Sequence, residues 1–260
     1  MTCKDVMGVL EVLAPVEFAE KWDNVGLLVG REDKQITKVM LALDATEDVI
    51  DQAIMMNADM LVTHHPLLFS AIKKITETDF VGRRLLKLCR HDICYYAMHT
   101  NFDVMGMADA AADEMRLHDI EVLDVTFEDD ISQEGIGRIG LLEREMSLKE
   151  CAEVCKQSFG LDNVRVFGAA DKIIDRVAIS PGSGKDFIAY AIEKQADVLI
   201  TGDIPHHAGI DAMEQGLAII DAGHYGLEKI FLPYMKAAFI RELPQIKVLC
   251  AREQSPFYVV

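Results

Sequence analysis

The sequence has few cysteines, few basic residues and no long hydrophobic run. Six cysteines scattered over 260 residues do not form a disulfide framework, so reduced and mostly buried thiols are expected. No stretch approaches the roughly 18 uninterrupted apolar residues of a membrane span, and the N-terminal segment has no apolar run of the signal-peptide type. These absences predict a cytoplasmic protein that does not contact a membrane.

Positive charge is scarce as well. The chain has 26 Lys and Arg against 43 Asp and Glu, which gives a formal net charge of -17 and a pI near 4.8. Such a charge repels polyanions at long range and argues against nucleic-acid binding through a basic surface. A small-molecule substrate, even an anionic one, remains compatible with this composition if its site is locally positive.

Hydrophobic residues, by contrast, make up 50% of the chain. A chain of this length and content can bury a large core, and it is long enough for one large or two modest domains. The acidic and irregular stretch Glu128-Asp129-Asp130 predicts a domain boundary. We therefore expect a first α/β domain over residues 1–127, completed by residues 231–260, and a second α/β domain over residues 128–230.

Two adjacent histidines follow a short apolar segment. Met60 to Val62 has the composition of a buried strand, and His64-His65 comes directly after it, closed by Pro66, which cannot continue a β-ladder. Strand ends are where ligands bind in α/β proteins, and neutral imidazole is the commonest metal ligand. Taken alone, two histidines in a loop are more often hydrogen-bonding or surface groups than metal ligands, so a metal site requires further ligands.

Two other segments could contact phosphate. Residues Asp79 to Arg90 form an amphipathic helix with a basic face, which we interpret as solvated surface rather than a phosphate site. Residues Ser180 to Asp186 precede a helix and could hold phosphate through backbone amides and Lys185, although they lack the full P-loop spacing.

The segment from Arg176 to Asp203 repeats an earlier strand-helix-strand pattern. Residues 53–63 and 191–201 are identical at six of 11 positions. The first copy continues with His64-His65 and the second with Gly202-Asp203. Two copies of one unit usually pack about a pseudo-twofold axis. We therefore expect two similar α/β halves, each with a β-sheet flanked by helices, and a metal site in the cleft between them.

The repeat continues beyond these strands and adds further candidate ligands. His99 and Asp103 in the first copy resemble His224 and Glu228 in the second, each a histidine followed four residues later by a carboxylate. Residues four apart lie on one side of a helical turn, so His224 and Glu228 could bind one ion together. The candidate ligands exceed one tetrahedral site and suit two bridged ions; they are His64, His65, Asp103, His224 and Glu228. A coincidental polar cleft is the alternative.

These motifs resemble the Nif-three-like family, whose members are often called GTP cyclohydrolase 1 type 2 homologues. The similarity runs through nearly the whole chain in family order, and its motifs are Trp22-Asp23-Asn24-Val25-Gly26, Thr63-His64-His65-Pro66, His99-Thr100-Asn101-Phe102-Asp103, Gly137-Arg138-Ile139-Gly140, Gly182-Ser183-Gly184, Thr201-Gly202-Asp203 with His207, and Gly223-His224-Tyr225-Gly226-Leu227-Glu228. The resemblance implies a two-domain α/β protein with a dinuclear metal centre, the same five ligands and a toroidal homohexamer. The chain departs from the family pattern at Gly106-Met107-Ala108 and at Pro205-His206.

Three functions fit these observations. The first is a metal-dependent hydrolase of a nucleotide-like or heterocyclic small molecule; the family name implies opening of the guanine ring of GTP. The second is a protein that buffers or delivers metal, and the third is a regulatory interaction protein without turnover. His99 and His207 are candidates for proton transfer or for support of the ligands. The ligand set accepts zinc, iron, manganese, nickel or cobalt.

Overall fold

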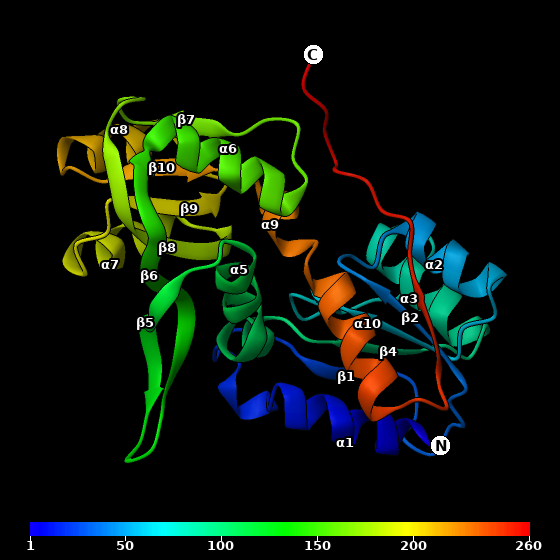
Figure 1. Cartoon of the computed structure of the whole chain (residues 1–260). Coiled ribbons are helices and arrows are strands. Elements are labelled where there is room, and N and C mark those ends of the chain that lie inside the picture. Colours follow the sequence, from blue (N-terminus) through cyan, green and yellow to red (C-terminus); the bar gives the residue numbers. More distant parts are fainter. The chain divides into compact units, whose positions relative to one another are not determined.

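The computed structural model describes all 260 residues, and they form two compact units. Unit 1 comprises Met1–Phe102 and Phe231–Val260, and unit 2 comprises Asp103–Ile230 (Figure 1). The fold is α/β, with one mixed sheet in each unit and helices beside it. None of the helices is both long and apolar enough to cross a membrane.

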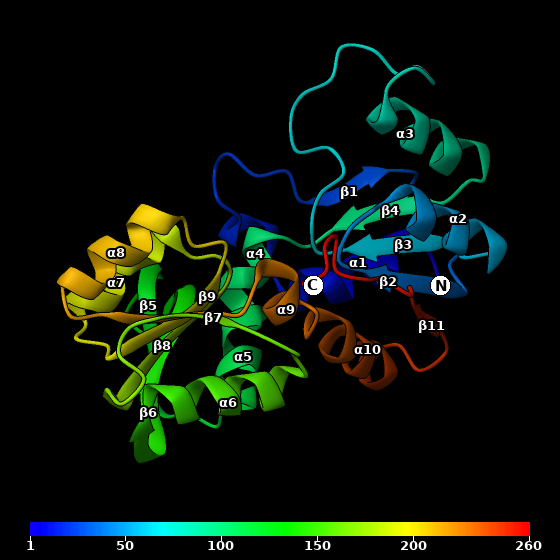
Figure 2. The same cartoon turned by 90° about the horizontal axis from the view of Figure 1, so that it is seen from above.

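Unit 1 is built on a five-stranded sheet of order β1-β4-β3-β2-β11, and Figure 2 shows β1, β4, β3 and β2 side by side in this order. Only β1 runs antiparallel to its neighbour. The elements of this unit are α1 (Cys3–Leu13), a 3-10 turn (Val16–Phe18), β1 (Gly26–Val29), β2 (Lys38–Ala42), α2 (Glu47–Met55), β3 (Met60–Thr63), α3 (Phe80–Arg90), β4 (Cys94–Ala97), α4 (Thr100–Phe102), α10 (Phe231–Glu242) and β11 (Lys247–Cys250).

Unit 2 carries a six-stranded sheet of order β5-β6-β8-β9-β10-β7. Strands β8, β9 and β10 are parallel, and the others pair antiparallel. The elements are a π-helical turn (Asp103–Met107), α5 (Ala108–Glu114), β5 (His118–Glu128), β6 (Gln133–Ser147), α6 (Leu148–Phe159), β7 (Arg165–Phe167), β8 (Ile173–Ser183), a 3-10 turn (Lys185–Phe187), α7 (Ile188–Glu193), β9 (Val198–Gly202), α8 (His206–Glu214), β10 (Ala218–Asp221) and α9 (His224–Glu228).

The division between the units lies between Phe102 and Asp103 rather than after residue 127. Residues 103–127 belong to unit 2 because β5 pairs along its length with β6, from His118 opposite Leu141 to Glu128 opposite Gln133. The acidic stretch at residues 128–130 is therefore the turn of a long hairpin. A hairpin turn and a domain linker share the same polar composition, so the sequence pattern did not separate them.

The sequence repeat corresponds to a structural one. In unit 1, the carboxylate Oδ2 of Asp59, just before β3, accepts hydrogen bonds from the backbone N–H groups of Thr37 and Lys38 at 2.8 and 2.9 Å. In unit 2, Oδ2 of Asp197, just before β9, accepts from the N–H groups of Asp175 and Arg176, both at 2.9 Å. Each aspartate thereby fixes its own strand against the start of the strand beside it.

A lysine completes both copies of this arrangement. Lys34 Nζ donates to the carbonyl oxygen of Asp59 at 3.0 Å, and Lys172 Nζ donates to that of Asp197 at 2.7 Å. In each copy, the same aspartate and lysine thus connect two neighbouring parallel strands near their N-terminal ends. In unit 1, this is the end opposite His64.

The second half of the sequence match is shifted by one residue in the structure. Beyond the last strand pairs, the Met98 N–H donates to Thr63 O and the Ala222 N–H donates to Thr201 O, so Met98 corresponds to Ala222. His99 therefore corresponds to Gly223 and not to His224. The sequence match aligned His99 with His224 because the two residues are identical. A one-residue offset cannot be detected from the sequence when the strand register is unknown.

Candidate metal centre

Buried backbone contacts fix the turn after β3. The Tyr95 hydroxyl donates to the carbonyl oxygen of His65 at 3.0 Å and accepts from the Leu67 N–H at 2.7 Å. Burial raises the pKa of Tyr95 to about 12, so this hydroxyl keeps its proton at neutral pH. The two histidines therefore leave the strand from a rigid turn.

His64 is fully buried, and its ring contacts those of Phe102 and Phe231. Its Nδ1 lies 2.8 Å from the carbonyl oxygen of Met98. A carbonyl oxygen only accepts hydrogen bonds, so Nδ1 carries the proton and Nε2 carries the lone pair. That tautomer can bind a metal through Nε2.

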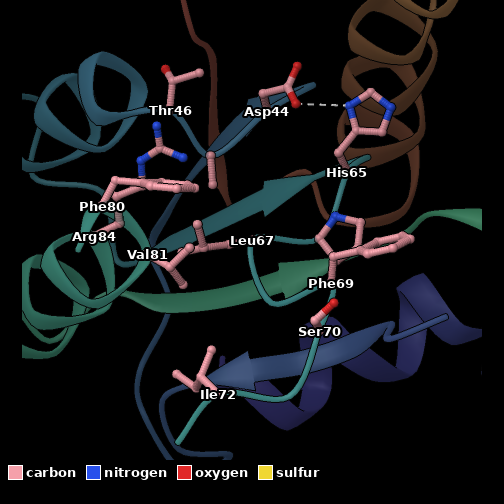
Figure 3. A pocket seen from close by; sticks show the side chains of 12 residues that line it. Asp44, Thr46, His65, Leu67, Phe69, Ser70, Ile72, Phe80, Val81 and Arg84 are labelled. Carbon is pink, nitrogen blue, oxygen red and sulfur yellow. Dashed lines mark hydrogen bonds and ion pairs between the residues drawn. The ribbon is translucent and has the colours of Figure 1, made fainter. Parts of the chain in front are cut away.

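His65 has the same arrangement with a carboxylate. Its Nδ1 lies 3.0 Å from Asp44 Oδ1, a contact drawn as a dashed line in Figure 3. Asp44 is itself held from the C-terminal segment, because Glu253 Oε1 accepts from the Asp44 N–H at 3.1 Å and Oε2 accepts from the Leu43 N–H at 2.7 Å. Burial raises the pKa of Glu253, and these two hydrogen bonds only partly offset that effect.

The aspartate that holds His99 is buried. Asp23 Oδ1 lies 2.9 Å from His99 Nδ1, and Oδ2 accepts from the N–H and the hydroxyl of Thr100 at 3.0 and 2.6 Å. Burial raises the pKa of Asp23, but the hydrogen bonds from His99 and Thr100 outweigh it and leave the pKa below its usual range. The carboxylate is therefore ionised at neutral pH and keeps the His99 proton on Nδ1.

The three imidazoles of unit 1 form one group. One ring nitrogen from each of His64, His65 and His99 lies within 4.8 Å of the other two, and the ring centroids are 4.8 to 5.6 Å apart. Because an oxygen lies against Nδ1 in each ring, Nε2 is the nitrogen left available to a metal in all three. The group therefore fits a metal.

His224 and Glu228 form a second pair of donors, in unit 2. They occupy α9, four residues apart, and His224 Nε2 lies 3.0 Å from Glu228 Oε2. The expectation that they lie together is confirmed. His224 Nδ1 lies 2.9 Å from Asp203 Oδ2, so Nε2 and the buried Glu228 carboxylate point their lone pairs at each other. A proton or a metal ion is needed between them.

Gly182 makes room for this carboxylate. A Cβ atom at Gly182 would lie 2.7 Å from Glu228 Oε1 and 3.9 Å from His224 Nε2, and the glycine has a φ of +83°. The end of β8 therefore packs against Glu228. Glycine is required at this position for both space and backbone conformation.

Two predicted site residues remain, Asp103 and His207. Asp103 is the first residue of unit 2 and opens the π-helical turn that follows α4. His207 is exposed in the first turn of α8, where its ring contacts that of His206 at 5.2 Å between centroids. It is not among the grouped donors.

The sequence analysis missed the three carboxylates that hold the imidazoles. Thr46 caps α2 by accepting from the Val49 N–H at 3.2 Å, and Asp44, two residues earlier, contacts His65 instead. Asp23 and Asp203 entered the sequence analysis only as members of motifs, with no histidine partner assigned to either. An aspartate at a strand end or a tight turn is the available signal, and it does not name the histidine partner.

Comparison with known proteins agrees with these motifs. The family model of Duf34/NIF3 (NGG1p interacting factor 3) matches residues 1–256. The chain belongs to the NIF3 family. Among curated NIF3 relatives, a Clostridium perfringens protein named GTP cyclohydrolase 1 type 2 homolog is 40% identical over 88% of this chain and 87% of its own length. A Lactococcus lactis protein of the same name is 36% identical over 99% of both chains.

The NIF3 fold is also found in solved structures. A Bacillus cereus protein related to NIF3 superposes with a TM-score of 0.91 over 100% of this chain and 99% of its own, at 24% sequence identity. The family resemblance inferred from the motifs is confirmed. This NIF3 protein thus has an α/β fold with two mixed sheets, and the histidine group of unit 1, which includes the buried His64, suggests a metal site.

Proposed function

We propose that this NIF3 protein binds two divalent transition-metal ions per chain and uses them to hydrolyse a small nucleotide-like or heterocyclic molecule. The proposed metal ligands are His64, His65, Asp103, His224 and Glu228. They combine imidazole with carboxylate, a set that zinc, iron, manganese, nickel and cobalt all accept.

One observation carries the proposal. In four imidazoles, Nδ1 lies 2.8 to 3.0 Å from an oxygen that only accepts, so each ring directs an Nε2 lone pair away from its holding group; they are His64, His65, His99 and His224. His118 differs, because its Nδ1 lies 3.1 Å from Asp119 Oδ2 but its Nε2 is also engaged, 3.1 Å from the carbonyl oxygen of Leu142. Metal-binding histidines regularly have the orientation of the other four, because a hydrogen bond at the other nitrogen fixes the tautomer and raises ligand basicity.

The chemistry follows from the proposed ions. When bound, a pair of such ions polarises a substrate oxygen and brings the pKa of bound water towards neutrality. The protein's own part is to hold the ligands, and to supply proton transfer beside them. His99, whose Nδ1 proton is held by ionised Asp23, is proposed for that second role. His207 stays a weaker candidate, because it is exposed and outside the grouped donors.

Metal content tests the first half of the proposal. Elemental analysis of untagged protein is expected to give about two first-row transition ions per chain. Glu228→Gln keeps the shape of the side chain but removes its charge, and should lower that content. Glu242→Gln, on the exposed end of α10, is the matched control. Equal and negligible metal in all three proteins would contradict the metal centre.

Turnover tests the second half. The names of the Clostridium and Lactococcus relatives make GTP the first substrate to try. Release of a ring-opened product that needs added zinc, manganese or iron, and that Glu228→Gln abolishes, is the expected result. Metal binding without turnover of any nucleotide would favour a protein that buffers or delivers metal, with hydrolysis abandoned.

The assembly is proposed as a homohexamer, as the family resemblance implies. Light scattering on the purified protein would show a mass about six times that of the chain. A monomer at micromolar concentration would contradict this assembly without affecting the ligands.

A further inference from the structure

A pocket of about 390 Å³ lies beside His65 in unit 1. It is lined by the segment between β2 and α2, by the loop that follows His65, and by the first turns of α3. Figure 3 shows Asp44 and His65 on one side of the pocket and Phe80 with Arg84 on the other. Its volume lies within the range of about 300 to 1,000 Å³ that is typical of small-molecule sites.

Arg84 differs from the other cations of α3. Arg83 pairs with Glu47 at 3.2 Å, Lys87 with Glu47 at 2.6 Å, and Arg90 with Glu77 at 2.5 Å. Each of these three cations is thus paired with a carboxylate. Arg84 makes no ion pair and no hydrogen bond, and its Nε is buried without a hydrogen-bond partner.

An aromatic ring holds the Arg84 side chain in place. Its guanidinium carbon lies 5.1 Å from the centroid of the Phe80 ring, and this stacking holds the guanidinium at the pocket wall. A chain with 43 Asp and Glu has ample carboxylates to neutralise a half-buried arginine, yet none does so here. Leaving a buried guanidinium N–H without an acceptor costs free energy that a bound anion would recover.

The carboxylates near the pocket are already engaged. Asp44 lines it but lies 3.0 Å from His65 Nδ1, and Glu47 of α2 pairs with Arg83 and Lys87. Thr46, which also lines the pocket, uses its oxygen to accept from Val49 N–H and keeps its hydroxyl proton for donation. The wall opposite His65 therefore offers a planar cation and a hydroxyl donor.

We propose that this pocket binds a small organic phosphate, with the phosphate group at Arg84 and the rest of the molecule extending past Phe69 and Phe80 towards His65. The guanidinium can donate two parallel hydrogen bonds to phosphate oxygens, and Thr46 adds a third donor. The apolar and aromatic wall suits a flat ring. The placement of the ligand's other end near His65 rests on the proposed function. What this inference adds is Arg84, the group that recognises the phosphate.

Binding of GMP and of guanosine to the protein as purified tests the proposal. The two probes share a ring and differ by the phosphate. In calorimetry, GMP should bind about tenfold or more tightly than guanosine, a difference of about 1.4 kcal/mol. Arg84→Gln should remove this difference, and Arg84→Lys, which keeps the charge but not the planar fork, should recover only part of it.

Arg83→Gln is the matched control, because it removes a neighbouring cation that is paired with Glu47. It should bind GMP as the wild type does. Thermal unfolding of each variant checks that the fold is kept. Equal affinity of the wild type for GMP and guanosine, no GMP binding at millimolar concentration, or unchanged GMP binding by Arg84→Gln would each overturn the proposal. Because binding needs no turnover, it can hold where hydrolysis fails, and it can fail while metal content stands.

Discussion

His64 Nδ1 lies 2.8 Å from the carbonyl oxygen of Met98, the residue that follows β4. The Met98 N–H in turn donates to Thr63 O at 2.9 Å, which continues the pairing of β3 with β4 beyond the last strand residues. The backbone of Met98 therefore both pairs with β3, through its N–H, and keeps the His64 proton on Nδ1, through its carbonyl oxygen. A tautomer held by the main chain is insensitive to the side chain at position 98.

This contact gives a pair of variants with opposite expectations. His64→Gln should lower metal content from about two ions per chain to one or fewer, since a ligand is lost. Met98→Leu conserves volume in the core and should leave metal content unchanged, at a stability cost of about 1 kcal/mol. Elemental analysis measures both. Metal loss in Met98→Leu alone would show that His64 is not oriented by the backbone.

Alanine substitutions at Gly182 and Gly216 distinguish the effect of backbone strain from that of steric contact with Glu228. Both glycines have positive φ, +83° and +86°, so Gly182→Ala and Gly216→Ala should each cost about 1–2 kcal/mol in backbone strain. Only at Gly182 would the new Cβ meet Glu228 Oε1, while at Gly216 nothing lies within 4 Å. Metal content should therefore fall in the first variant and not in the second. Identical metal content in the two would remove Glu228 from the ligands.

The lowered pKa of Asp23 predicts that the stability of the folded chain depends on pH. Its pKa is lower in the folded chain than in the unfolded chain, where an aspartate has a pKa of about 3.9. Such a group contributes stability that is fully present above the unfolded pKa and is lost as the pH falls through the folded pKa. Asp23→Asn should lower the free energy of unfolding by about 2 kcal/mol at pH 7, and the gap from wild type should narrow below about pH 4.

Denaturant unfolding at pH 7 and at pH 3 measures this gap. Asp33→Asn removes the same charge at an exposed position and should give little difference from wild type at either pH. A gap for Asp23→Asn that stays constant with pH would mean that the carboxylate contributes through packing and not through its charge.

Asp59 and Asp197 should have equivalent effects in different units. Each carboxylate accepts two backbone N–H groups, so Asp59→Ala and Asp197→Ala should each destabilise by about 2–3 kcal/mol. The loss should be local. Hydrogen exchange is expected to quicken in β2 and β3 for the first variant and in β8 and β9 for the second. Quickened exchange spread evenly over both units in either variant would show that the units unfold as one.

Local pattern predicted the α/β fold, the end of β3 and the pairing of His224 with Glu228. Apolar runs reveal buried strands, and residues four apart in a helix meet wherever the helix lies. The repeat at Asp59 and Asp197 was visible because it lies within one strand-helix-strand unit. These features need no knowledge of distant contacts.

Long-range partners could not be predicted in the same way. Asp23 and His99 are 76 residues apart, and Asp44 and Glu253 are 209 apart, so no spacing rule connects them. The predicted domain boundary after residue 127 differs from the observed one for a related reason. Residues 103–127 belong to unit 2 because β5 pairs with β6, a contact that the sequence pattern does not show. The odd position of Arg84 among the cations of α3 likewise depends on where acidic residues of α2 come to lie.

Unit 2 is one continuous stretch of chain, whereas unit 1 is made of two stretches that flank it. During synthesis, residues 103–230 leave the ribosome before β11 and Glu253 exist. Unit 2 can therefore fold while unit 1 still lacks its edge strand, and Asp44 lacks its contact with Glu253. Unit 1 thus begins the chain but is completed after unit 2, and the contact that holds Asp44 beside His65 forms only when the C-terminal segment docks.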